Sequence, residues 1–222
     1  MRTLFTTIFI LFHLSTNAEN LGTDEQRVIK SKGFVTVTKK IEGAVWPEII
    51  IKSIIKTTPL TAVAIFAAYD YQKNYVPGLL KSDIHKVTSP TQVQVSYELK
   101  MPWPLSNGVY INDHKLTSPH NGSYKISWKS ISNSSAKDVI GSATFLPFPG
   151  QKGHTLMTYR NHVVPDSVFA GILRKLMVKD VEKSIAATIE ATETLAKQKS
   201  TLLLKYESKI IDALKGKDPY KL

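Results

Sequence analysis

The segment HTLMTYRNHVVPDSVFAGILRKLMVKDVEKSI, residues 154–185, contains the change of periodicity that decides the fold. The part before Pro165 has the length of a β-strand. Beyond this proline, apolar residues from Phe169 to Ile185 recur at helical spacing. The segment therefore predicts a strand followed by a long helix that begins near Asp166.

The predicted helix continues far toward the C-terminus. No glycine or proline interrupts the chain between Ile172 and Leu214, but the apolar pattern weakens from Gln198 to Thr201, where we expect a break. After the break, apolar residues repeat among lysines. We therefore predict a separate helical tail over residues 200–222.

A series of strand-length blocks precedes the helix, and short turn sequences separate them. The blocks cover residues 79–87, 92–101, 109–117, 124–131, 139–148 and 154–164. Each gap is short enough for a hairpin, whereas parallel neighbours would need long crossover connections. The blocks therefore predict a continuous antiparallel meander.

Two further strands and a short helix are predicted before the meander. The strands cover residues 34–41 and 48–56, and the second is rich in isoleucine. Thr58 then offers a helix N-cap, and an Ala-rich helix is expected to continue through Tyr71. With the meander and the long helix, these elements predict one α+β domain over residues 23–199.

The N-terminal residues have the layout of a secretory signal. Arg2 precedes an apolar run from Leu4 to Leu14, and small residues follow up to Ala18. We therefore predict a signal peptide over residues 1–18, cleavage near Ala18, and a periplasmic or extracellular location. The alternative is a buried N-terminal helix or strand. The absence of cysteine from the sequence excludes disulfides, thiolate metal sites and cysteine nucleophiles.

The chain is basic, with a formal net charge of +11 at pH 7. Such a charge favours transient contact with an anionic membrane surface or with acidic partners. Export makes nucleic acid an unfavourable partner, so we expect no nucleic-acid binding.

The order of strands and helices resembles the START-related, Bet v 1-like helix-grip superfamily (SRPBCC). Three strings carry the resemblance: TTPLTAVAIFAAYD at 57–70, MPWPLSNGVY at 101–110, and GHTLMTY at 153–159. The resemblance implies a curved antiparallel sheet wrapped around a long C-terminal helix, with a cavity between them. The chain departs from the family at Gly108 to Tyr110, where START domains usually have an Arg-Asp-aromatic triplet. A buried arginine is therefore absent from this position.

The sequence contains few signs of catalytic chemistry. Its six histidines show no metal-ligand spacing, and there is no Gly-x-Ser-x-Gly elbow, P-loop or dinucleotide fingerprint. We therefore predict neither a metal nor a cofactor. His114 is the histidine of interest, because it alternates with Asn112 and Tyr110 onto one face of a predicted strand.

We predict a binding site of ten residues. Seven of them alternate onto the inward face of predicted strands, and three lie on the stripe of the final helix that faces the sheet. The site residues are Tyr97, Leu99, Tyr110, Asn112, His114, Trp128, Tyr159, Phe169, Leu173 and Met177. The first hypothesis is an exported carrier of a lipid or other apolar small molecule. The alternative is an enzyme like the polyketide aromatase/cyclases, with His114 or Tyr159 as acid or base. An interaction protein with a filled interior is the third possibility.

Overall fold

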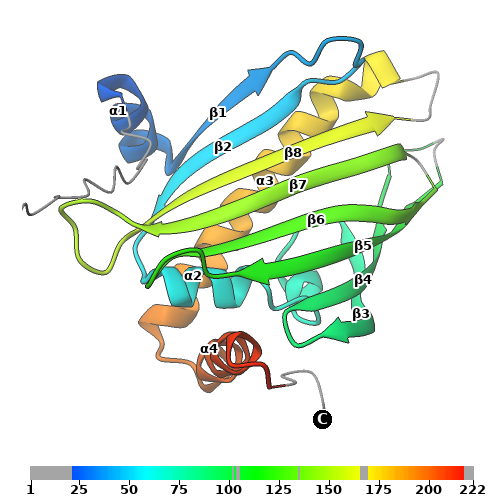
Figure 1. The fold of residues 1–222 in the computed structure, drawn as a ribbon. Coiled ribbons are helices and arrows are strands. Elements are labelled where there is room, and N and C mark those ends of the chain that lie inside the picture. Colours follow the sequence, from blue (N-terminus) through cyan, green and yellow to red (C-terminus); the bar gives the residue numbers. More distant parts are fainter. Residues whose placement is uncertain (1–21, 102, 104–105, 135, 166–169, 218–222) are drawn as a thin grey trace, which may run out of the picture.

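The computed structural model describes residues 22–101, 103, 106–134, 136–165 and 170–217. The predicted signal peptide lies outside these residues. Within them, eight antiparallel strands form one curved sheet in the order β1-β2-β8-β7-β6-β5-β4-β3 (Figure 1). The strands are β1 (Phe34–Lys39), β2 (Glu48–Ile55), β3 (Leu79–Ser89), β4 (Gln92–Leu99), β5 (Gly108–Thr117), β6 (Tyr124–Asn133), β7 (Ala136–Pro147) and β8 (Thr155–Pro165).

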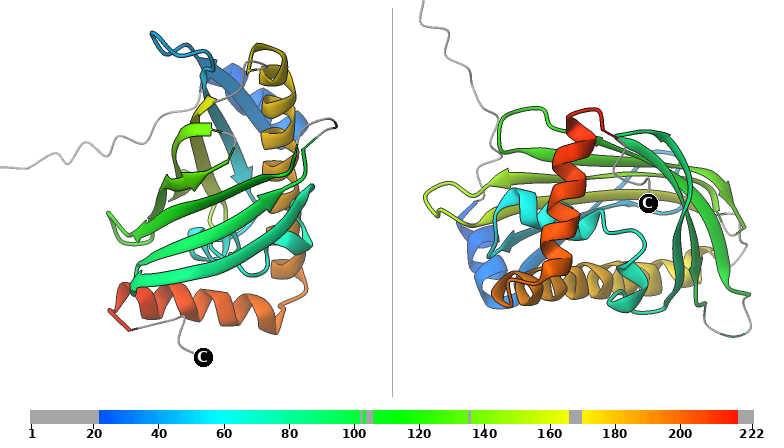
Figure 2. Two further views of the ribbon diagram at one scale, coloured as in Figure 1. Left: turned by 90° about the vertical axis from the view of Figure 1, so that its right-hand side faces the viewer. Right: turned by 90° about the horizontal axis from the view of Figure 1, so that it is seen from below.

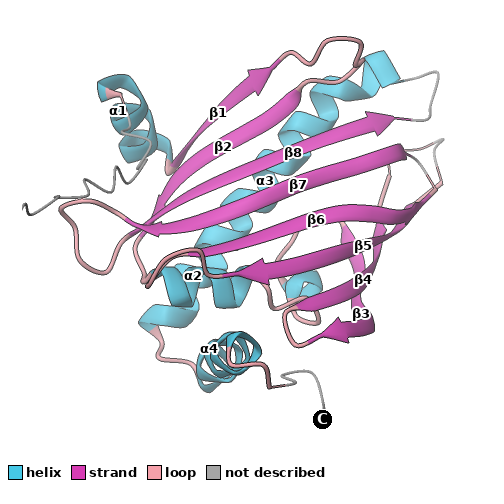
Figure 3. Cartoon of the chain, viewed as in Figure 1, coloured by secondary structure: helices cyan, strands magenta, loops and turns pink. Residues whose placement is uncertain are grey.

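The helices lie on both sides of this sheet, and short loops join the elements (Figure 3). They are α1 (Thr23–Lys32), α2 (Pro59–Phe66), the single 3-10 turn η1 (Gln72–Asn74), α3 (Ala170–Lys197) and α4 (Thr201–Leu214). Two views show α3 along the open side of the curved sheet (Figures 1 and 2). The arrangement confirms the predicted α+β helix-grip architecture.

The meander is confirmed, because β3 to β8 pair with one another in sequence order. β2 then joins the far edge of β8, with Ile51 opposite Tyr159. The start of the final helix, predicted near Asp166, falls in residues 166–169, which lie outside the described residues. The described part of α3 begins at Ala170.

The Ala-rich helix α2 begins as predicted but ends earlier. The Thr58 side chain accepts a hydrogen bond from the Thr61 backbone N–H at 3.3 Å, which is the expected N-cap. The helix ends at Phe66, so its predicted continuation to Tyr71 is wrong. The side-chain amide of Gln72 donates to the Phe66 carbonyl at 2.7 Å and satisfies an acceptor at the helix end.

The predicted break after the long helix is confirmed. Lys199 has a φ of 48°, the left-handed conformation that commonly ends helices. The Ser200 N–H donates back to the Leu195 carbonyl at 3.1 Å, and the Ser200 side chain caps α4 by accepting from the Leu202 N–H at 3.2 Å. The chain therefore changes direction between α3 and α4.

The break lets α4 pack across α2 (Figure 2). Leu203, Tyr206 and Ile210 form its buried face. Thr61 of α2 donates its hydroxyl hydrogen to Glu207 Oε1 at 2.5 Å. No helix in the described parts of the chain is long and apolar enough to span a membrane.

The main core lies on the concave side of the sheet, where α2 contacts β6, β7 and β8 while α3 contacts β2 and α2. A smaller cluster lies on the convex side, where Ile29 of α1 packs with Leu156, Ile54 and Val35. The concave side of the sheet is therefore the side on which α2 and α3 pack.

Candidate ligand-binding site

A continuous row of aromatic rings crosses the concave face. Tyr110 stacks on Tyr97 with ring centroids 5.0 Å apart, and Tyr97 meets the His114 ring edge-on at 5.8 Å. The His114 ring lies 6.1 Å from Trp128, which lies 5.4 Å from Tyr159. We call these five residues the aromatic row. They come from β4, β5, β6 and β8 and form a broad surface with polar tips.

The row passes over β7 at a glycine. Gly141 lies between Trp128 and Asn161 in the strand register. The indole N–H of Trp128 donates across it to Asn161 Oδ1 at 3.1 Å. A Cβ atom at Gly141 would lie 2.4 Å from the indole ring and 2.6 Å from the Arg160 carbonyl oxygen. Only glycine therefore lets the indole lie flat over β7.

His114 lies near the centre of the row, and its ring is enclosed by aromatic neighbours. Its Nε2 shares a hydrogen bond of 3.1 Å with the Tyr97 hydroxyl, and the Tyr69 ring lies 4.7 Å from it. Burial lowers the pKa of His114 from 6.5 to about 3 and raises the pKa of Tyr97. Both side chains are therefore neutral at physiological pH.

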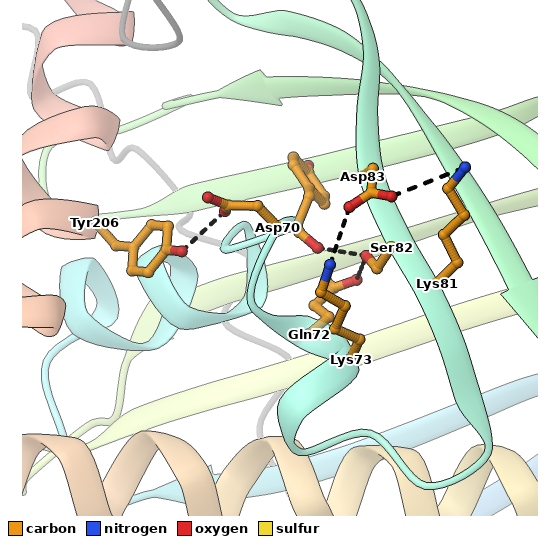
Figure 4. Close-up of polar contacts among 8 residues, drawn as sticks. Asp70, Gln72, Lys73, Lys81, Ser82, Asp83 and Tyr206 are labelled. Atoms are coloured by element: carbon orange, nitrogen blue, oxygen red, sulfur yellow. Dashed lines mark hydrogen bonds and ion pairs between the residues drawn. The ribbon is translucent and has the colours of Figure 1, made fainter. Parts of the chain in front are cut away.

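Tyr69 is a member of the site that the sequence pattern did not indicate. It lies in the turn after α2, and its carbonyl accepts a hydrogen bond from the buried Ser82 hydroxyl of β3 (Figure 4). Next to this contact, Lys73 and Asp83 form an ion pair at 3.1 Å. The early end of α2 turns Tyr69 toward the sheet, where it packs on His114.

The predicted site residues fall into three groups. Those buried on the concave face are Tyr97, Asn112, His114 and Trp128. Those half-buried are Leu99, Tyr110, Tyr159 and Met177, and all but Leu99 pack against the main core. Phe169 lies outside the described residues, and Leu173 is placed only as a position in α3. The structure thus brings the strand residues of the prediction onto one face.

Other parts of the described chain offer weaker sites. No three histidine, aspartate or glutamate side chains gather there in a group that could hold a metal ion. An open surface hollow lies beside α1, lined by Thr23, Gln26, Arg27 and Lys30. It is open and shallow, and α1 packs on the convex side of the sheet, away from the aromatic row. The concave face therefore remains the candidate site.

No family model and no curated protein matches the sequence. Solved structures do match the fold. One is a STAR-related lipid transfer protein from Xanthomonas axonopodis, with a TM-score of 0.65 and 15% identity over 72% of this chain and 94% of that chain. The chain has the START-like helix-grip fold.

Two other START-like structures are similar to this chain. Human STARD10 has a TM-score of 0.61 and 15% identity, covering 87% of this chain and 89% of that chain. The Zhui aromatase/cyclase from Streptomyces sp. R1128 has a TM-score of 0.54 and 12% identity, covering 67% of this chain and 94% of that chain. The predicted resemblance is thus confirmed for the fold.

Proposed function

We propose that the protein is an exported carrier that holds a lipid or other apolar small molecule between the concave face of the sheet and α3. The observation that carries the proposal is the aromatic row, because rings with polar tips on a concave apolar face are typical of ligand sites. The START-like fold supports it, since one neighbour is named as a lipid transfer protein.

An acid–base role for His114 or Tyr159 is the enzymatic alternative, favoured by the aromatase/cyclase neighbour. Burial raises the pKa of Tyr159, so its hydroxyl is a weak acid at neutral pH. A general base works best when its pKa is near the working pH. Burial places the pKa of His114 near 3, so the ring is a weak base at neutral pH. His114 and Tyr159 therefore support binding better than catalysis.

Export and membrane contact are parts of the proposal. The apolar run that ends near Ala18 supports export to the periplasm or the outside of the cell. Trp103, in the connection between β4 and β5, is 93% exposed, and Lys100, three residues earlier in the chain, is also exposed. An exposed indole and an exposed lysine in one connection favour brief contact with an anionic membrane surface.

One mass-spectrometric experiment tests the carrier and its export together. Protein recovered from outside the cytoplasm of a producing cell should have the denatured mass of a chain that begins at Glu19. Its native mass should be higher by that of a bound lipid. An intact N-terminus would contradict export. The absence of any adduct, together with no binding of the apolar dye Nile red, would contradict the carrier.

Paired tryptophan substitutions on α3 locate the site. Met177 is half-buried against the core, whereas Lys179 two residues later is exposed. Met177→Trp should fill the space beside the sheet and remove both the adduct and Nile red binding. Lys179→Trp should keep both. Equal binding in the two variants, with unchanged circular dichroism, would place the ligand elsewhere.

A further inference from the structure

The concave face carries no buried charged side chain among the residues whose burial the structure describes. None of the aspartate, glutamate, lysine and arginine side chains in this set is classed as buried, and the buried carboxylate oxygen of Asp113 lies on the opposite face of β5 from His114. His114 is buried, but burial lowers its pKa to about 3 and keeps it neutral. A charged group that enters such a space loses its hydration without gaining a counter-ion, which is strongly unfavourable. The concave face thus disfavours carboxylate, phosphate and ammonium groups.

Several buried polar atoms on this face have no hydrogen-bond partner among the described residues: Thr36 Oγ1, Ser53 Oγ, Asn112 Oδ1 and His114 Nδ1. Asn112 and His114 are the pair that lies on one strand among the aromatic rings, and their side chains are each 6% exposed. The other ring nitrogen of His114 is already bonded to Tyr97. Buried polar atoms are nearly always paired in folded proteins, so two unpaired atoms together indicate a partner from outside the chain.

The two residues are placed to act on one group. They lie two positions apart on the same face of β5, about 7 Å along the strand. On β4, Val95 lies opposite Asn112 and Val93 lies opposite His114, and on β6 Trp128 lies opposite His114. A ligand whose apolar body lies along the aromatic row would bring its polar head group to this part of β5, where the two unpaired atoms lie.

We infer that Asn112 and His114 form a polar subsite for a ligand with an uncharged, hydrogen-bonding head group, such as a hydroxyl, carbonyl or amide. The inference rests on the proposed carrier function and specifies the class of its cargo. Aromatic rings also attract quaternary ammonium groups. Such a group has no hydrogen-bond donor, however, and would leave both Asn112 and His114 unpaired.

A matched series of probes tests the subsite. The probes 1-dodecanol, dodecanoate and dodecyltrimethylammonium share one alkyl chain and differ in head group, and each is used to displace Nile red from the purified protein. Wild-type protein should bind dodecanol at least about tenfold more tightly than either ion, the factor expected for one good hydrogen bond. Equal or tighter binding of an ion would overturn the inference.

Substitutions separate hydrogen bonding from simple apolar preference. Asn112→Leu, which keeps the number and branching of the side-chain heavy atoms, should weaken dodecanol binding about tenfold relative to the binding of both ions, with displacement referred to the variant's own Nile red affinity. His114→Phe should do the same. The control is Thr192→Val, because the Thr192 hydroxyl already donates to the Thr188 carbonyl at 2.7 Å, and this variant should keep the wild-type ranking.

The outcomes distinguish the two proposals. Nile red that fails to bind the wild-type protein would overturn the carrier function and with it the subsite. Nile red that binds, with dodecanol affinity unchanged in folded Asn112→Leu or His114→Phe, would overturn the subsite alone. If a variant fails to fold by circular dichroism, the other variant and the wild-type ranking of the three probes decide.

Discussion

One side of the concave face is aliphatic and the other is aromatic and polar. On β2, Ile49, Ile51 and Ile55 are fully buried and pack into the main core, next to α3. On β4 and β5, Tyr97 and His114 occupy the same face. Both sides follow the same alternation, so strand pattern alone does not separate them. Side-chain chemistry does: the first side is mainly isoleucine with one unpaired hydroxyl at Ser53, and the second combines aromatic rings with the unpaired atoms of Asn112 and His114.

The largest loss of stability is expected from a substitution on the aliphatic side of the concave face. Ile51→Ala should lower the free energy of unfolding by about 2–5 kcal/mol, because it removes methyl groups from a fully buried site. Nile red affinity of the folded variant should stay at the wild-type value. Urea denaturation and dye titration measure the two effects.

The control for this substitution is Val45→Ala, at a position that is 62% exposed. It should change the free energy of unfolding by less than about 0.5 kcal/mol. A small loss of stability in Ile51→Ala, accompanied by altered dye affinity, would instead place Ile51 in the wall of the ligand space and abolish the distinction between the two sides.

Acid should lower the free energy of unfolding because His114, on the aromatic side, is buried in its neutral form. The unfolded chain binds a proton at this residue near pH 6.5, whereas the folded protein resists protonation until about pH 3. The contribution of neutral His114 to the free energy of unfolding is therefore complete above pH 6.5. It is lost as the pH falls from 6.5 toward 3, by about 1.4 kcal/mol for each pH unit. Urea midpoints at pH 7, 6 and 5 measure the slope.

His114→Gln should flatten this dependence relative to the wild-type protein. The matched control is His85→Gln, because His85 is exposed and its removal should preserve the slope. The comparison of variants matters because carboxylates also titrate toward pH 4. Identical slopes in all three proteins would show that His114 does not resist protonation.

The smallest effect is expected where the aromatic row crosses β7. Gly141→Ala should cost about 1–3 kcal/mol, since its methyl group would meet the Trp128 indole and the Arg160 carbonyl. Thermal unfolding measures the loss. Gly22→Ala, at a position with open space around the Cβ, should leave the midpoint nearly unchanged. A neutral Gly141→Ala would mean that the indole moves aside freely.

The strand phase of the site was predictable, whereas the cross-strand contacts were not. Alternation along one strand is enough to place Asn112 and His114 on one face, and the pattern of β5 confirms it. The position of Tyr69 was missed, because the end of α2 depends on a side-chain amide from Gln72 that local propensity does not reveal. The role of Gly141 likewise appears only when β6, β7 and β8 are in register.

The place of β8 in the sheet sets the order of assembly. β8 is the last strand to be synthesised, yet it lies between β7 and β2, and β2 comes from the beginning of the domain. The edge of the isoleucine-rich β2 that pairs with β8 therefore stays unpaired until almost the whole domain has been synthesised. Such distant pairing slows folding and leaves β-prone segments exposed to aggregation. A chaperone that shields β2 during this interval should raise the yield of folded protein more than one that acts on the finished chain.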